Sequence, residues 1–230
     1  MFCRDFRIFA AGMETTEIMK KYKAYLFDFD YTLADSSKGI VKCFRIVLDN
    51  HDYQGISEMQ IKRTIGLTLE ESFALLTGVS DPTVLAAYKA EYVKAADVHM
   101  TANTVLFPET LKVLRSLKEQ GAQLGIISTK YRYRILDLLS RYLGDDFLDV
   151  VIGGEDVRAH KPSPEGLLAA LDRLKVAADV VLYLGDSVVD AQTARAAGVD
   201  FAGVLHGMTT REELQAYPHV ALMPSLEELL

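Results

Sequence analysis

The sequence predicts an α/β protein with a doubly wound, Rossmann-like parallel sheet and an inserted, all-helical cap domain. Two observations predict this fold. Short apolar runs alternate with amphipathic segments, and most runs are apolar at successive positions, as in strands that helices cover on both faces. Between Asp35 and Phe107, roughly 70 residues intervene without a convincing strand, far more than the two to six residues of a usual βα loop.

Five apolar runs bounded by Gly, Asp or Ser are the predicted strands: 24–27, 124–127, 150–152, 180–184 and 201–204. The long interval after the first strand divides the chain into a core domain of residues 22–35 and 107–230 and a cap of residues 36–106. Residues 1–21 are expected to form a flexible N-terminal leader, because their apolar stretch is shorter than the core of about 7–15 residues in a signal peptide.

Helices of the core are predicted from apolar residues three and four apart, with Gly at the end or Pro at the start. The three predicted stripes are Leu111, Leu114 and Leu117, ending at Gly121; Ile135, Leu138, Leu139 and Tyr142, ending at Gly144; and Leu167, Leu168, Leu171 and Leu174, entered through Pro164. Three further helical faces fall in the insertion: Ile40, Val41, Phe44, Val47 and Leu48; residues 69–76; and residues 82–96. The insertion leaves the carboxyl end of the first strand, where open α/β sheets hold ligands, so we interpret it as a lid over an active site.

Composition excludes several classes of function. Half of the 230 residues are hydrophobic, and 25 basic against 32 acidic residues give a net charge of −7, the wrong sign for a partner of nucleic acid. The longest apolar runs have five or six residues, whereas a membrane span needs about 20. Cys3 and Cys43 lie far apart without a CxxC motif, which argues against disulfide scaffolds and zinc modules and fits a cytoplasmic location.

Two acidic residues, Asp28 and Asp30, follow the first predicted strand directly. Residues two apart on an extended chain point to the same side, so both carboxylates should enter one crevice. A hard divalent ion such as Mg²⁺ would relieve their repulsion, and a carboxylate held beside that ion can attack phosphorus. The alternative is a solvated turn with an acidic cap.

Three further polar groups occur near the ends of later strands. Ser128 and Thr129 could donate to a phosphate or cap a helix. Lys161, between His160 and Pro162, could neutralise a phosphoryl group or be solvated. Asp186, with Ser187 next to it and Asp190 four residues later, could complete a metal site or cap a helix. All of these groups fall at the sheet edge that binds ligands, so coincident capping is the weaker explanation.

Together these motifs resemble the haloacid dehalogenase-like superfamily, and within it the phosphoglycolate phosphatase and pyrophosphatase-like subgroup with a helical cap. The resemblance rests on DFDYTL at 28–33, ISTK at 127–130, KPSP at 161–164 and GDS at 185–187 with Asp190 downstream. It implies specific roles for the matching residues: Asp28 as nucleophile, Asp30 as general acid and base, Ser128, Thr129 and Lys161 on the phosphate, Asp28, Asp186 and the Asp30 carbonyl on the metal, and Asp190 and Ser187 behind the metal ligands.

One position departs from the family pattern. The family usually has Gly after the second Asp, where this chain has Tyr31. The tyrosine is expected either to narrow the site or to turn its ring toward the cap.

The resemblance implies a Mg²⁺-dependent phosphatase that hydrolyses a small phosphomonoester of the phosphoglycolate kind, or pyrophosphate, through an aspartyl-phosphate. A sugar-phosphate mutase and a non-catalytic phosphate-sensing protein are the alternatives, while Asp30 disfavours carbon–halogen cleavage. The expected partner is a small phosphorylated metabolite, not nucleic acid or a membrane, and the chain could be a monomer or a homodimer. Substrate choice is expected to reside in the cap, where the candidates are Arg45, Arg63, Gly66 and Thr68.

Overall fold

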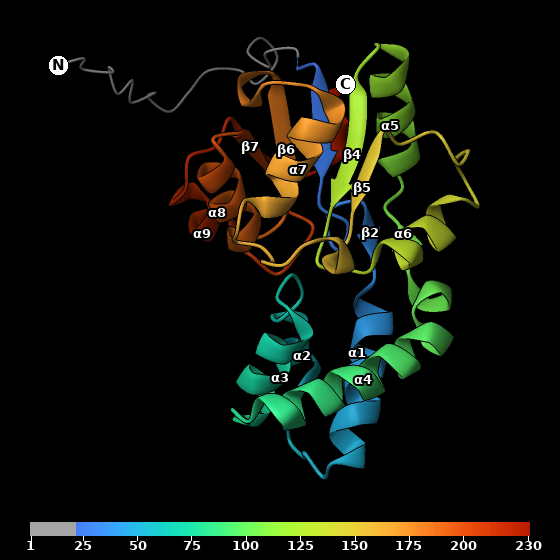
Figure 1. Cartoon of the computed structure of the whole chain (residues 1–230), viewed down its shortest axis with the longest axis vertical. Helices are drawn as coiled ribbons and strands as arrows, with labels where there is room; N and C mark the ends of the chain where they lie inside the picture. Colours follow the sequence, from blue (N-terminus) through green and yellow to red (C-terminus); the bar gives the residue numbers. More distant parts are fainter. Residues whose placement is uncertain (1–21) are drawn as a thin grey trace, which may run out of the picture.

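The computed structural model describes residues 22–230, so the predicted leader lies outside the described residues. It confirms the predicted fold class: a six-stranded parallel sheet in the order β5-β4-β1-β6-β7-β8, with helices on both sides (Figure 1). The strands are β1 (Ala24–Phe27), β4 (Gln123–Ile127), β5 (Val150–Ile152), β6 (Val181–Gly185), β7 (Asp200–Val204) and β8 (Ala221–Met223). The last of these was not predicted, and only Met223 of its three residues is fully buried.

Each face of the sheet carries its own hydrophobic core. Tyr25 and Phe27 belong to one buried cluster, whereas Ala24 and Leu26, which alternate with them along β1, belong to the other. This alternation explains why the strand is apolar at every position. The helices of this domain are α5 (Thr110–Glu119), α6 (Arg132–Leu139), α7 (Glu165–Leu174), α8 (Val188–Ala197) and α9 (Arg211–Gln215), with short 3₁₀ turns at Gly154–Asp156, Ala178–Val180 and Leu226–Leu229.

Two residues of the predicted helical stripes do not face the core. Helix α6 ends at Leu139, so Tyr142 lies beyond it and is about half exposed. Leu168 lies within α7 but on its solvent side. Single apolar residues on a surface are ordinary, and a periodic pattern alone does not fix where the last turn ends.

A second group of helices forms the cap: α1 (Ser37–Asn50), α2 (Glu58–Lys62), α3 (Leu69–Thr77) and α4 (Pro82–His99), followed by a 3₁₀ turn at Thr101–Asn103. They enclose a separate hydrophobic cluster in which the Phe44 ring centroid lies 4.7 Å from that of Phe73 and 4.9 Å from that of Tyr92. Cys43 is a buried free thiol in this cluster. In Figure 1 the cap lies beyond the lower end of the sheet.

A short antiparallel ladder joins the two parts of the molecule. It pairs β2 (Ala34–Asp35) with β3 (Val105–Leu106), the segments through which the chain leaves and re-enters the core. We expected no strand between Asp35 and Phe107, and this expectation is wrong at the end of the interval, where β3 lies. Two-residue strands leave no periodic signal, since the pairing depends on chain segments that are about 70 residues apart in sequence.

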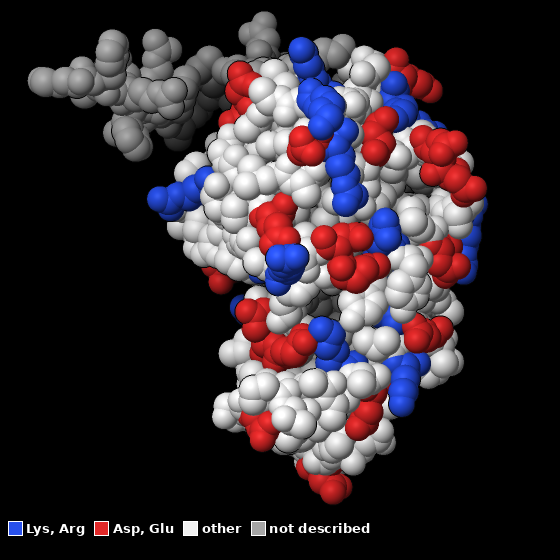
Figure 2. All heavy atoms as spheres, in the orientation of Figure 1, with Lys and Arg blue, Asp and Glu red and all other residues white. Residues whose placement is uncertain are grey.

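On the face drawn in Figure 2, acidic and basic side chains are interspersed, and a hollow separates the core from the cap. Neither sign of charge gathers in one large patch on this face. Among residues 22–230, no helix combines the length and apolar character needed to cross a membrane.

Candidate active site

The predicted polar groups meet at the carboxyl edge of the sheet. Asp28 follows β1, Ser128 follows β4 and Asp186 follows β6; these three strands are adjacent in the sheet. The backbone N–H of Asp28 donates to the carbonyl of Leu184 at 2.8 Å, which extends the pairing of β1 with β6 up to the site. All three polar side chains are buried, with Asp28 only 2% exposed.

Lys161 connects two of the acidic groups. Its Nζ lies 2.9 Å from Asp28 Oδ1 and donates to Asp190 Oδ1 at 2.6 Å and to the Tyr183 hydroxyl at 3.3 Å. Burial alone would lower the pKa of Lys161, but the carboxylates of Asp190 and Asp28 outweigh it and raise that pKa well above its usual value. Lys161 therefore carries a fixed positive charge beside Asp28.

A surplus of negative charge surrounds this lysine. Carboxylate oxygens of Asp28, Asp186 and Asp190 lie within 4.8 Å of one another, and all three residues are buried. Burial, followed by the charges of Asp190 and Asp28, raises the pKa of Asp186 well above its usual value. Burial raises the pKa of Asp28 to about 6, against the opposing effect of Lys161. One lysine does not balance three carboxylates, so the cluster fits a divalent cation.

Asp190 has little capacity left for a metal. Its Oδ1 accepts from Lys161 and from the Tyr183 hydroxyl at 2.9 Å, and its Oδ2 accepts from the Ser187 hydroxyl at 2.5 Å and the Ser187 N–H at 3.2 Å. By contrast, Asp28 Oδ1 accepts no aligned hydrogen bond. Asp28 and Asp186 are therefore the carboxylates that could hold the ion, while Asp190 orients Lys161 and caps α8 together with Ser187.

Asp30 is separate from this cluster. Sequence spacing predicts that its carboxylate shares a crevice and a cation with Asp28, but it pairs instead with Lys130, whose Nζ donates to Asp30 Oδ2 at 3.0 Å. Both partners are largely buried. The chain turns after Phe29, and the Tyr31 N–H donates to the Ala34 carbonyl. The extended geometry behind that prediction therefore ends between the two aspartates. Lys130 has no role in the sequence interpretation, although it follows Thr129 directly.

Residues 25–204 match the family model of haloacid dehalogenase-like hydrolases. The chain belongs to this family. It is 31% identical over 208 residues to the probable phosphatase IndB of Dickeya dadantii, covering 89% of this chain and 90% of that one. It is 31% identical over 216 residues to a phosphoglycolate phosphatase of Rhodospirillum rubrum, covering 90% and 89%. A haloacid dehalogenase-like structure from Bacteroides fragilis superposes with a TM-score of 0.90 at 60% identity, covering 91% of this chain and all of that one.

The backbone at Tyr31 has the conformation that explains why glycine is usual at this position. This residue has a φ of 58°, in the left-handed region that glycine enters freely and that a tyrosine enters only at a cost. Its side chain is buried and lines a cavity between the cap segment at Lys62 and Arg63 and the core at Asp186 and Ser187. Burial raises the pKa of the Tyr31 hydroxyl to about 12. Tyr31 thus lines the cavity beside Asp186 together with residues of the cap.

The four cap candidates divide into two pairs. Gly66 lines a cavity against the core, and a Cβ there would lie 3.8 Å from the Ser187 hydroxyl; Arg63 lines the cavity beside Asp186. Arg45 instead donates to the Ile56 carbonyl within the cap, and the Thr68 hydroxyl caps α3 by accepting from the Glu71 N–H. Neither of the latter lines the two cavities described, so their assignment to substrate binding stays a prediction.

Gly207 is a site residue that sequence reasoning missed. A Cβ at this position would lie 1.9 Å from Asp186 Oδ2, closer than any real contact. Nothing in the sequence around Gly207 signals this, because Asp186 is 21 residues away and the approach depends on the loop after β7. Close packing of a backbone against a functional carboxylate is one of the uses of glycine.

We expect Gly207→Ala to lower kcat/KM on the order of 100-fold, since a displacement of about 1 Å in a catalytic group can have an effect of this size. The measurement is phosphate release together with a thermal unfolding curve. Gly144→Ala is the matched control, because a Cβ there meets nothing within 4 Å. Equal activity of the two variants would contradict the role of Gly207.

Proposed function

We propose that this chain is a Mg²⁺-dependent phosphatase that hydrolyses a small phosphomonoester or phosphoanhydride through an aspartyl-phosphate on Asp28. The observation that carries the proposal is the position of Asp28, a buried carboxylate whose Oδ1 lies 2.9 Å from the Lys161 ammonium and which clusters with Asp186. Identity to proteins named as phosphatases supports the same reaction class. Mg²⁺ is proposed from the all-oxygen, carboxylate-rich donor set.

In the first step, an oxygen of Asp28 attacks phosphorus and the bond from phosphorus to the leaving oxygen breaks. Asp30, in its protonated form, transfers its proton to that oxygen, so that a neutral alcohol or a protonated phosphate departs. In the second step, Asp30 takes a proton from water, which attacks the phosphorus of the aspartyl-phosphate and releases phosphate and free Asp28. The proton that Asp30 gives to the leaving oxygen in the first step is thereby recovered in the second.

The other groups of the site act on charge and orientation. Lys161 offsets negative charge on the phosphoryl oxygens beside Asp28, and the Ser128 and Thr129 end of β4 provides hydrogen-bond donors for them. A divalent ion held by Asp28 and Asp186 would supply further charge neutralisation when bound. The Lys130 ammonium holds the Asp30 carboxylate on the cap side of the site, where the leaving group would be.

The proposal is tested by ranking phosphoglycolate, pyrophosphate, sugar phosphates and nucleoside monophosphates by kcat/KM in the presence of Mg²⁺. The expected result is stoichiometric phosphate release from at least one of these classes. Transfer of phosphate to a second sugar hydroxyl without net release would favour a mutase. Binding of phosphate esters without any turnover would contradict an enzyme of either kind.

A further inference from the structure

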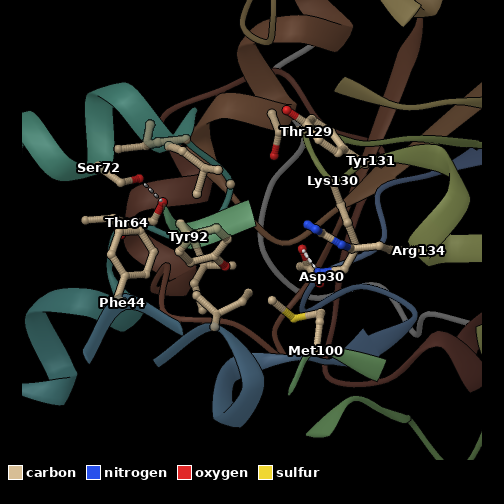
Figure 3. Close-up of a pocket in the computed structure, with 15 residues that line it drawn as sticks. Asp30, Phe44, Thr64, Ser72, Tyr92, Met100, Thr129, Lys130, Tyr131 and Arg134 are labelled. Carbon is tan, nitrogen blue, oxygen red and sulfur yellow. Dashed lines mark hydrogen bonds and ion pairs between the residues drawn. The ribbon is translucent and has the colours of Figure 1, made fainter. Parts of the chain in front are cut away.

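The cavity between the core and the cap carries an uneven charge, and this inference about it rests on the proposed function. The charged residues that line it are Asp30, Lys130 and Arg134, so two cations face one carboxylate. Figure 3 shows Lys130 and Arg134 reaching into this cavity from one side and Phe44 and Thr64 facing them from the other. The Asp30 carboxylate is already paired with Lys130, which leaves Arg134 as the cation without a partner inside the cavity.

Arg134 is held rigidly despite its length. One of its terminal nitrogens, Nη2, donates to the Val93 carbonyl at 2.9 Å and to Asp97 Oδ1 at 2.6 Å, both on cap helix α4. Its guanidinium carbon lies 5.5 Å from the ring centroid of Tyr131 and 5.0 Å from that of Tyr133. The side chain is 7% exposed. A guanidinium fixed in this way loses little further freedom when it binds a ligand.

The Nε–H of this guanidinium is unsatisfied. Arg134 Nε is buried and has no hydrogen-bond partner, a costly state for an N–H of a charged group. Arg134 thus has Nη2 committed to the cap, whereas its buried Nε has no acceptor.

We propose that Arg134 determines specificity by binding an oxyanion carried on the leaving group of the substrate, either a carboxylate or a second phosphoryl group. Asp30 fixes where the leaving oxygen must lie, and Arg134 borders the same cavity beyond it. Apolar side chains of Ile40, Phe44 and Met100 form the cap wall of this cavity. The substrate class is therefore a phosphomonoester of a small hydroxy acid, or a small bisphosphate.

The inference is tested with three substrates in wild type and Arg134→Gln. Phosphoglycolate carries a carboxylate, pyrophosphate carries a second phosphoryl group, and 2-hydroxyethyl phosphate carries neither. Loss of a charge-assisted hydrogen bond corresponds to about a 10- to 100-fold change in binding. We expect Arg134→Gln to raise KM by that factor for the anionic leaving group that fits, with a smaller change in kcat, and to alter kcat/KM for 2-hydroxyethyl phosphate by less than about 3-fold. A larger effect on phosphoglycolate than on pyrophosphate identifies a carboxylate, and the reverse a phosphoryl group.

Two control variants distinguish a role of Arg134 in substrate binding from a purely structural role. Arg141→Gln removes an exposed arginine that pairs with Asp137 and should change nothing. Asp97→Asn weakens the attachment of Arg134 to the cap but keeps the guanidinium, so the preference for anionic leaving groups should persist. Equal losses of kcat/KM in Arg134→Gln on all three substrates would show that Arg134 only holds α6 against the cap. That result would overturn the inference but would not contradict the proposed phosphatase activity. If wild type hydrolyses none of the three, nor any other phosphate ester, the proposed function fails as well.

Discussion

Asp28→Asn is expected to lower kcat/KM by about 10⁴-fold or more, because the loss of a covalent nucleophile removes the reaction path itself. An amide oxygen does not form a stable acyl phosphate, whereas the neighbouring Lys161 still has Asp190 as its ion-pair partner. Phosphate release from p-nitrophenyl phosphate measures the loss. Mass spectrometry of acid-quenched enzyme should detect an adduct of about 80 Da, the mass of one phosphoryl group, in wild type. The variant should show no adduct.

Stability provides the check that this variant remains folded. The pKa of Asp28 is raised by burial to about 6 in the folded protein, from an ordinary value of 3.8. A carboxyl whose folded pKa is raised is destabilising once it ionises, so its contribution is favourable at low pH and is lost as the pH rises through 6. In chelator at pH 7, Asp28→Asn should therefore unfold at a temperature no lower than wild type. A residual activity above about 1%, well beyond the loss expected for a missing nucleophile, would contradict the assignment of Asp28.

The sequence predicts those features of the fold that local pattern controls. Strand β1 is buried along its whole predicted run, and in the predicted stripe of α5 Leu114 and Leu117 are buried while Leu111 is half-buried. Strand β8 and the β2–β3 ladder were missed, and each is stabilised by pairing with another segment of the chain. Local propensity carries little information about such pairing.

The same distinction applies to the site. Asp28, Lys161 and Asp186 could be predicted to meet because each follows or lies near the end of a parallel strand, and strand ends share one edge. The partner of Asp30 could not be predicted, because it depends on the turn that begins at Phe29 and directs the two carboxylates to different lysines. Gly207 and Arg134 act through contacts with residues 21 and 37 positions away, Asp186 and Asp97. Such contacts leave no trace in spacing.

Removal of divalent ions should reduce the activity of the wild type to background, and Mg²⁺ should restore it. The physical reason is the unbalanced charge of the buried cluster, where Asp28, Asp186 and Asp190 face a single ammonium group. The same charge should make the ion stabilise the fold. A ligand at 100 times its Kd adds about 2.7 kcal/mol, which corresponds to a Tm rise of about 5–10 °C for a chain of this size.

Asp186→Asn distinguishes binding of the metal ion at this site from a general effect of ionic strength. This variant keeps Asp28 and its contact with Lys161 but removes one of the two carboxylates that are free to hold the ion, so both the Tm rise and the recovery of activity should require a much higher Mg²⁺ concentration. Asp172→Asn, which alters an exposed carboxylate on α7, should respond as wild type does. A Tm rise of equal size in Asp186→Asn would place the ion elsewhere, and activity that survives chelation would show that Lys161 alone neutralises the phosphoryl group.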